Sequence, residues 1–317
     1  MLKERGFYHG INLGGWLSQC DYSTERLDGF IREEDIAQIA SWGFDHVRLP
    51  VDYNVIQNPD GTMIEDGLRR IDRALAWCER YGLHTVLDLH KTQGFSFDFG
   101  EAEKGFFDSE AYQEKYYAVW ECFAARYGGL SGRVMFDLLN EVTEECFIGE
   151  WKRISRECVR RIRRLAPDVL ILLGSYPWNS AQAVPALDAP FDDKVIYNFH
   201  FYEPHEFTHQ GAYWMAPPFD QDRRMTFAES GAGEEFVEEF IAPALEKARK
   251  EGAELYCGEY GVIDVVPPEE AIRWFRAVHA VFERYGIGRS MWSYKEMDFG
   301  LTDARLDGVR EELLTLV

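Results

Sequence analysis

The stretch Val134-Met-Phe-Asp-Leu-Leu-Asn-Glu141 is a short apolar run that ends in an amide and a carboxylic acid. It is followed by Glu150–Leu165, where apolar residues recur at helical spacing, and then by a second apolar run at Val169–Leu173. Two such runs joined by an amphipathic segment are typical of parallel strands connected by a crossover helix. This unit therefore predicts a parallel sheet with helices packed on it.

The same alternation continues through the rest of the chain in both directions. Candidate strands are Tyr8–Leu13, Asp45–Leu49, His84–Leu89, Val134–Leu139, Val169–Leu173, Val195–Phe201, Glu254–Gly258 and Gly288–Ser293. Amphipathic helices are expected at Glu34–Trp42, Leu68–Tyr81, Glu110–Tyr127, Glu150–Leu165, Glu234–Glu251 and Glu269–Tyr285, with a short helical stretch near Ser180–Leu187 and a last helix over Val309–Leu316. Because right-handed crossovers make closure the natural arrangement, the sequence predicts an α/β fold, a (β/α)8 TIM barrel.

An open, doubly wound sheet is the main alternative to a barrel. It would carry Gly-x-Gly-x-x-Gly between an early strand and its helix, but Gly14-Gly15-Trp16 lacks the spacing that places a pyrophosphate on a helix N-terminus. The length of 317 residues lies within the range of one α/β barrel, and no low-complexity linker interrupts the chain. We therefore expect a single catalytic domain over residues 1–317.

Composition and charge narrow the classes of partner. The chain is 46% hydrophobic and 28% charged, which is typical of a globular protein with a sizeable core. A formal net charge of −21 repels phosphate backbones and anionic lipids, so we expect neither a nucleic-acid partner nor a membrane partner. A glucan or oligosaccharide is uncharged, so the negative charge of the protein does not repel it. The oligomeric state stays open.

The N-terminus and the cysteines bear on location. Residues 1–8 have no apolar core of the length that a signal peptide needs, and the longest aliphatic run, Val169–Leu173, is too short to span a bilayer. We expect a cytoplasmic location for the chain as written, and secretion if a signal peptide has been removed. The six cysteines form no Cys-x-x-Cys pair and are expected to be reduced, mostly structural thiols: Cys20, Cys78, Cys122, Cys146, Cys158 and Cys257.

Polar and aromatic side chains fall at the ends of six predicted strands, where an α/β barrel places its catalytic groups. They are Arg48, His90, Asn140 with Glu141, His200 with Tyr202, Glu259, and Trp292. Taken singly, most have an ordinary explanation, such as an ion pair, a core histidine, a helix cap or packing. Glu259 is harder to explain in this way, because an apolar strand delivers its carboxylate with no basic neighbour in sequence. Independent accidents would not all fall at one end of the barrel, so this end is expected to be an active site.

Two glutamates from the fourth and seventh strands suit the hydrolysis of an acetal, in which one carboxyl protonates the leaving oxygen and the other attacks the anomeric carbon. Carboxyl groups about 5–5.5 Å apart lead to retention of configuration, whereas about 6.5–9.5 Å admits a water and leads to inversion. We predict the short distance. Repulsion between the carboxylates should keep Glu141 protonated, while Arg48 lowers the pKa of Glu259.

An aromatic content of 15% fits a sugar site, because pyranose faces pack on rings while the hydroxyls hydrogen-bond at the edges. Trp292 is expected to form the platform under the cleaved sugar, Asn140 to hold its 2-hydroxyl, and Tyr202 to hold Glu259. Loop aromatics either line further subsites or bury local surface. The candidates are Phe95, Phe97, Phe99, Trp178 and Trp214.

These residues resemble the pattern of glycoside hydrolase family 5, the cellulase family, across essentially the whole chain. The family's eight functional positions have counterparts, in strand order, at Arg48, His90, Asn140, Glu141, His200, Tyr202, Glu259 and Trp292. The resemblance implies Glu141 as acid/base and Glu259 as nucleophile, with the other residues contacting the substrate. It also implies a retaining mechanism with neither a metal nor an organic cofactor.

Longer motifs resemble the clostridial endoglucanase C type of this family. They are Gly10-Ile-Asn-Leu-Gly-Gly-Trp-Leu17, Gly43-Phe-Asp-His-Val-Arg-Leu-Pro50, Tyr197-Asn-Phe-His-Phe-Tyr202 and Tyr256-Cys-Gly-Glu-Tyr-Gly-Val262, with Thr208-His-Gln210 and Tyr294-Lys-Glu-Met-Asp-Phe299. That type cleaves β-1,4-glucan and mixed-linkage β-1,3-1,4-glucan, so the resemblance implies an endo-acting β-glucanase.

Two departures from that type bear on the substrate. Lys91 follows His90 where many cellulases of the family have a second histidine, and the segment between Tyr202 and Glu259 looks shorter. Residues 12–17 also resemble the family's exo-β-1,3-glucanases. The alternative is therefore an exo-β-1,3-glucanase, or a β-glucosidase acting on short gluco-oligosaccharides.

Two other classes of function compete with this one. A metal-dependent barrel hydrolase would carry His-x-His after the first strand, where this chain has Asn12-Leu13. A non-catalytic glucan-binding protein would not need both Glu141 and Glu259 together with their supporting residues.

Overall fold

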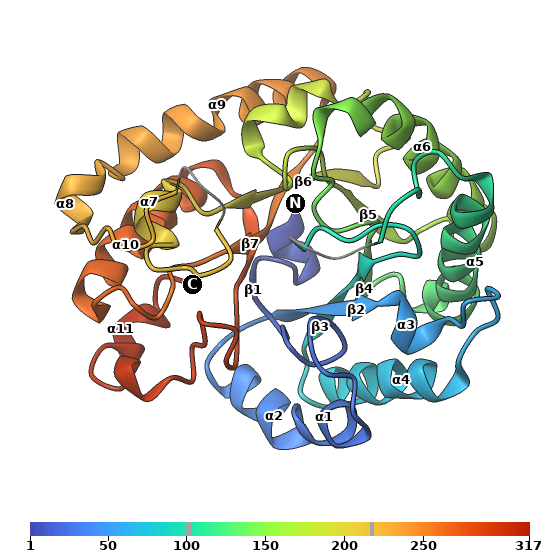
Figure 1. Cartoon of the computed structure of the whole chain (residues 1–317), viewed down its shortest axis with the longest axis horizontal. Coiled ribbons are helices and arrows are strands. Elements are labelled where there is room, and N and C mark those ends of the chain that lie inside the picture. The colour runs from blue at the N-terminus through green and yellow to red at the C-terminus, as the bar shows by residue number, and fades with distance from the viewer. Residues whose placement is uncertain (99–102, 216–218) are drawn as a thin grey trace.

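The computed structural model describes residues 1–98, 103–215 and 219–317. Within them, parallel strands close into a barrel in the order β1-β2-β3-β4-β5-β6-β7-β8, so the predicted (β/α)8 fold is confirmed. The strands are β1 His9–Asn12, β2 His46–Asp52, β3 His84–Lys91, β4 Val134–Asp137, β5 Leu170–Leu173, β6 Val195–Phe201, β7 Leu255–Tyr260 and β8 Gly288–Met291. Figure 1 shows the strands around the centre of the molecule and the long helices on the outside. Phe99 lies outside the described residues.

The outer layer follows the predicted alternation. Its α-helices are α1 Thr24–Gly29, α2 Glu33–Ser41, α3 Tyr53–Ile56, α4 Glu65–Arg80, α5 Glu110–Tyr127, α6 Ile148–Leu165, α7 His205–Thr208, α8 Phe227–Ser230, α9 Glu234–Glu251, α10 Pro268–Tyr285 and α11 Arg310–Leu313. Helix α5 begins where the Ser109 side chain accepts a hydrogen bond from the Tyr112 N–H. Helix α10 ends at Gly286, whose φ of 64° suits a residue without a side chain.

Several predicted boundaries differ from the structure. The stretch after β5 is the 3₁₀ helix η4, Ala181–Ala186, which contains Pro185, and α9 packs against it. The last helix, α11, is shorter than predicted, whereas β2 and β3 run further because Asp52 pairs with Lys91. Short helices such as α1 and α3 carry too few turns to give a periodic signal. The remaining 3₁₀ helices are η1 Leu2–Arg5, η2 Gly128–Leu130, η3 Glu145–Phe147 and η5 Ala304–Leu306.

The barrel interior is mostly apolar at its N-terminal end and polar at its C-terminal end. Val86 pairs with Met135 between β3 and β4, and two residues later, on the same face, Asp88 pairs with Asp137. The apolar end is closed by an inner cluster, to which η1 contributes Leu2, and Figure 1 places the N-terminus within the ring of strands. The cluster consists of Leu2, Phe7, Val86, Met135, Leu170, Leu172, Ile196 and Tyr256. The buried carboxyl groups Asp88 and Asp137 therefore lie beneath the mouth, whereas the N-terminal end holds His46 within hydrogen-bond distance of Tyr256 and Ser290.

Two further expectations concern the helices and the thiols. Across residues 1–98, 103–215 and 219–317, no helix is both long and apolar enough to cross a bilayer. All six cysteines are free thiols, and Cys78, Cys158 and Cys257 are buried. This agrees with the expectation of reduced, mostly structural cysteines.

Candidate active site

A cavity of about 560 Å³ opens at the C-terminal ends of the strands. Six of the sequence-predicted residues line it, and the other two, Arg48 and Asn140, are fully buried and hydrogen-bonded to the lining groups or to each other. The six lining residues are His90, Glu141, His200, Tyr202, Glu259 and Trp292. The structure therefore brings all eight predicted positions into one site.

Arg48 is the central cation of this site and is inaccessible to solvent. Its guanidinium donates to Glu259 Oε1 at 2.7 Å and to Asp137 Oδ2 at 3.0 Å, and lies 3.1 Å from Asp88 Oδ2. It also donates to the Asn140 Oδ1 at 2.9 Å, which fixes the amide next to Glu141. A planar fork of donors can satisfy several acceptors at once, so Arg48 compensates the buried negative charges.

Asp88 and Asp137 are site residues that the sequence reasoning did not single out. Burial raises the pKa of each carboxyl to about 7, although the charge of Arg48 opposes the rise. Asp88 also lies 2.6 Å from the His90 Nδ1 and orients that ring. Each is an aspartate with a large apolar residue on both sides in sequence, and this pattern is the signal that could have identified them.

Glu259 is presented to the cavity by an irregularity in β7. The register between β6 and β7 shifts after Phe199, and the Gly258 N–H donates to Asn198 Oδ1 at 2.9 Å. A side chain at Gly258 would lie 2.8 Å from that same oxygen, so only glycine fits here. The Tyr202 hydroxyl donates to Glu259 Oε2 at 2.9 Å, and Arg48 holds the other oxygen. Burial raises the pKa of Glu259, and Arg48 provides the strongest opposing effect.

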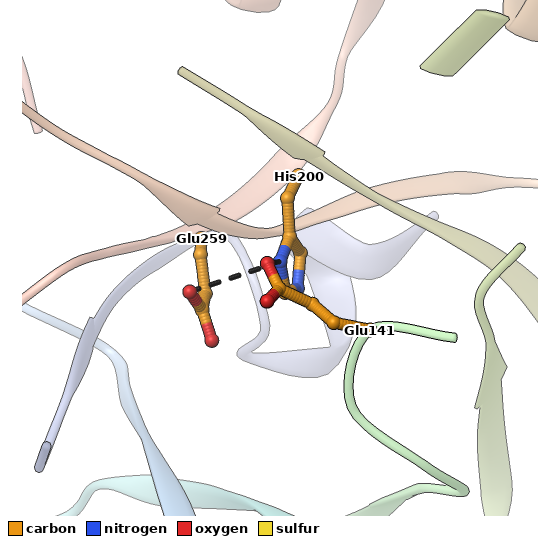
Figure 2. A group of neighbouring side chains, drawn as sticks. All are labelled: Glu141, His200 and Glu259. Atoms are coloured by element: carbon orange, nitrogen blue, oxygen red, sulfur yellow. Dashed lines mark hydrogen bonds and ion pairs between the residues drawn. The ribbon is translucent and has the colours of Figure 1, made fainter. Parts of the chain in front are cut away.

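Glu141 differs from Glu259 in its backbone and in its electrostatics. Its φ of 46° lies in the left-handed region, which is strained for a residue with a side chain and is often found at active sites. Its Oε1 lies 2.7 Å from the His200 Nδ1, and Figure 2 shows the Glu141 carboxyl group beside the His200 ring. Burial, followed by the charge of Glu259, raises the pKa of Glu141 well above its ordinary value. Protonation is therefore favoured at Glu141 over Glu259, whose charge is stabilised by Arg48.

Both active-site histidines are neutral. Burial lowers the pKa of His200 well below its ordinary value and lowers that of His90 to about 4. The Asn179 amide lies 3.3 Å from His200 Nε2, and donation from this amide leaves the ring proton on Nδ1, facing Glu141. A neutral His200 can therefore donate to Glu141 without placing a second full positive charge beside Arg48.

Aromatic rings form one wall of the cavity. Trp292 and His90 are stacked, with ring centroids 5.8 Å apart and planes 2° from parallel. Of the loop aromatics considered in the sequence, Phe97, Trp178 and Trp214 line the cavity. Phe95 does not, because it is buried against Phe106 and Phe107. Lining residues that the sequence reasoning missed are Gln19, Asp98, Pro177, Ser180, Glu203, His205, His209, Tyr213, Met215, Met297, Asp298 and Phe299.

Glu141, His200 and Glu259 also have the spacing of a metal site, with one ligand atom of each within 4.8 Å of the others (Figure 2). The surroundings fit a metal poorly. The Arg48 guanidinium contacts Glu259 at 2.7 Å and would repel a divalent cation, and the His200 Nδ1 is occupied by Glu141. The donor set is better suited to holding two carboxyl groups in different protonation states.

The sequence profile described as Cellulase (glycosyl hydrolase family 5) matches residues 10–298. The chain belongs to glycosyl hydrolase family 5. Among family 5 relatives, Cellodextrinase A of Ruminococcus flavefaciens is 58% identical over 91% of this chain and 86% of its own length. Endoglucanase C of Acetivibrio thermocellus is 37% identical over 98% of both chains.

Solved structures resemble the same barrel. The Cel5A structure of Thermotoga maritima in complex with mannotriose has a TM-score of 0.84 at 24% identity and covers 99% of both chains. The cellulose synthase subunit Z of Clostridioides difficile has a TM-score of 0.83, also at 24% identity, and covers 98% of this chain and 99% of its own. At this level of identity the likeness establishes the fold, while the family assignment establishes that the chain is a glycoside hydrolase.

Proposed function

We propose that this family 5 enzyme hydrolyses β-glucan with retention of configuration, with Glu141 as acid/base and Glu259 as nucleophile. The observation that carries the proposal is the short separation of the two carboxyl groups, whose nearest oxygens lie within 4.8 Å. An inverting enzyme must hold a water between them and needs about 6.5–9.5 Å. A direct attack by Glu259 on the anomeric carbon fits the smaller space.

In the first half of the reaction, Glu141 gives its proton to the glycosidic oxygen as the bond from that oxygen to the anomeric carbon breaks. Glu259, ionised and held by Arg48 and Tyr202, attacks the anomeric carbon and forms a glycosyl ester. The Asn140 Nδ2 is buried and makes no hydrogen bond within the described residues, while its Oδ1 is fixed by Arg48. We assign this amide N–H₂ to the 2-hydroxyl of the cleaved sugar, which stacks on Trp292.

In the second half, the changed charge of Glu259 switches the role of Glu141. Formation of the ester removes the negative charge that helps to raise the pKa of Glu141, so this pKa falls and Glu141 ionises. It then takes a proton from water, whose oxygen attacks the anomeric carbon and releases the sugar from Glu259. Two inversions at one carbon give net retention.

For the substrate, we propose β-1,4-glucan or mixed-linkage β-1,3-1,4-glucan, cleaved internally by one catalytic domain over residues 1–317. The similarity to Endoglucanase C supports endo action. The similarity to Cellodextrinase A, which is greater in identity, favours short β-1,4-linked oligosaccharides as a second candidate. An exo-β-1,3-glucanase or a β-glucosidase is the further alternative.

Product analysis over time separates these candidates. The substrates are barley mixed-linkage glucan, carboxymethylcellulose, laminarin and cello-oligosaccharides. A rapid fall in viscosity with early mixed oligosaccharides supports endo action, hydrolysis confined to the oligosaccharides supports a cellodextrinase, and glucose alone from chain ends supports the exo alternative. Proton NMR of the first product then tests the mechanism, since initial release of the β-anomer means retention and release of the α-anomer contradicts it.

A further inference from the structure

Glu203 is a buried acid on the wall of the cavity that the mechanism does not use. Its side chain is 16% exposed and lines the cavity, and no lysine or arginine within the described residues forms an ion pair with it. Burial raises the pKa of Glu203 to about 7. Burying an acid without a cation partner is unfavourable, so its presence here calls for a polar group that the protein itself does not supply.

Within the part of the chain that the structure describes, one side-chain oxygen of Glu203 accepts a hydrogen bond from another residue and the other does not. Oε2 accepts a hydrogen bond from the Tyr202 backbone N–H at 3.0 Å. The His205 Nδ1 lies 4.0 Å from Oε1, which is beyond hydrogen-bond distance. The Glu203 backbone is fixed, because its carbonyl accepts a hydrogen bond from the Trp274 indole at 2.9 Å. A rigid backbone therefore presents Oε1 as an open acceptor.

The closed barrel indicates on which side of the catalytic pair this acceptor lies. Glu141 follows β4 and Glu259 lies in β7, so β4 and β7 divide the ring of strands into two arcs. The arc β8-β1-β2-β3 carries Trp292, on which the cleaved sugar stacks in the proposed mechanism. The other arc, β5-β6, carries Glu203 and lies across the Glu141–Glu259 pair from Trp292. The leaving part of the substrate is therefore expected over the β5-β6 arc.

The other groups on this arc suit a sugar ring. His205 and His209 line the cavity close together, with ring centroids 5.1 Å apart, and burial lowers the pKa of both, so they are uncharged donors and acceptors. Trp214 lies beside His209, with ring centroids 6.2 Å apart, and Trp178, which follows β5, also lines the cavity. Hydroxyl-binding edges beside aromatic faces are what a pyranose needs.

We propose that Glu203 Oε1 accepts a hydrogen bond from a hydroxyl of the glucosyl unit on the leaving-group side of the scissile bond. Glu203 is then a specificity residue for substrates whose leaving group is a sugar. The inference rests on the proposed function, because it takes the positions of the cleaved and leaving sugars from it. A hydrogen bond to a charged acceptor corresponds to about a 10–100-fold effect on kcat/KM.

The test compares Glu203→Gln with Glu206→Gln, which makes the same change at an exposed position on the same loop. Glutamine keeps a carbonyl oxygen for the Tyr202 N–H but offers an N–H₂ donor in place of the free acceptor oxygen. The substrates are cellotetraose and an aryl β-cellobioside, whose leaving group has no sugar hydroxyls. We expect Glu203→Gln to lower kcat/KM about 10–100-fold more for cellotetraose than for the aryl cellobioside, and Glu206→Gln to change neither.

Equal losses on both substrates would overturn the inference, because they would mean that Glu203 acts through Tyr202 and Glu259 or through the fold. A wild-type enzyme that hydrolyses neither β-glucan nor gluco-oligosaccharides would instead overturn the proposed function. Transglycosylation gives a second measurement that does not depend on cleavage of the first bond. With cellobiose added as acceptor during turnover of the aryl substrate, Glu203→Gln should need more cellobiose to form transfer product, and an unchanged requirement would also count against the proposal.

Discussion

Replacing Tyr202 by phenylalanine removes one hydroxyl and leaves the ring in place. That hydroxyl lies 2.9 Å from Glu259 Oε2, on a side chain that is 9% exposed, so water cannot easily take over the lost hydrogen bond. A hydrogen bond to a charged group contributes about 1.5–3 kcal/mol. Divided by 1.36 kcal/mol per pKa unit, the loss raises the pKa of the Glu259 carboxyl by about 1–2 units.

The sign of the effect on rate follows from the role of Glu259. The nucleophile must be ionised, so protonating it stops the reaction, and the acid limb of kcat/KM against pH reports its ionisation in the free enzyme. The hydroxyl donates to the charged form and favours it, so Tyr202→Phe moves the acid limb to higher pH, by about 1–2 units. An aryl β-cellobioside is the substrate of choice because its leaving group depends little on protonation by Glu141.

A matched control lies in the preceding strand. Tyr197 in β6 is also buried, but its hydroxyl donates to the backbone oxygen of Asp188 at 2.8 Å, away from the carboxyl pair. Tyr197→Phe should leave the acid limb where it is in the wild type. A Tyr202→Phe enzyme that loses rate with an unmoved acid limb would refute the electrostatic reasoning and leave only a positioning role for the hydroxyl.

Three further predictions concern neighbouring residues. Glu141→Ala should lower the steady-state rate on glucan about 10²–10⁴-fold, but should lower the rate of the first step on an aryl cellobioside, measured by stopped flow, far less. Equal losses on the two substrates would argue against an acid role. Arg48→Met leaves Asp88 and Asp137 without a cation, so urea denaturation should show a loss of about 3–5 kcal/mol at pH 8. The loss should be smaller at pH 5, because protonated carboxyl groups need no cation. Their pKa values are raised in the folded state, so the variant gains stability as the pH falls. An equal loss at both pH values would contradict this. Gly258→Ala places a methyl group 2.8 Å from Asn198 Oδ1, so it should lower the unfolding free energy by about 1–3 kcal/mol and also lower activity. A melting curve like that of the wild type would show that the strand relaxes without cost.

The barrel could be predicted from sequence because its signal is regular. Strands such as Val134–Asp137 are apolar runs bounded by helices, and this pattern depends on periods that a single sequence carries. The ends of β2 and β3 could not be predicted, since Asp52 and Lys91 become part of strands only by pairing with each other. Pairing across strands is a property of the folded state.

Some residues of the candidate site could be predicted from sequence and others could not. Residues at strand ends, such as Glu259, could be identified because the barrel fixes where strand ends meet. Loop residues have no such reference: Phe95 and Phe97 are two positions apart and equally aromatic, yet one is buried against Phe106 and the other lines the cavity. Glu203 follows Tyr202 directly, but only its unpaired environment in the folded protein distinguishes it from the exposed Glu206.

The left-handed backbone at Glu141 has a consequence for anyone who selects variants of this enzyme by their resistance to heat. A residue with a side chain in that conformation costs about 1–2 kcal/mol, and glycine or asparagine adopts it more readily. Replacing Glu141 by glycine would therefore relieve the strained turn and remove a buried acid in one step. A screen that rewards a high melting temperature alone would enrich chains that have lost their proposed proton donor, so each round needs a turnover assay beside it.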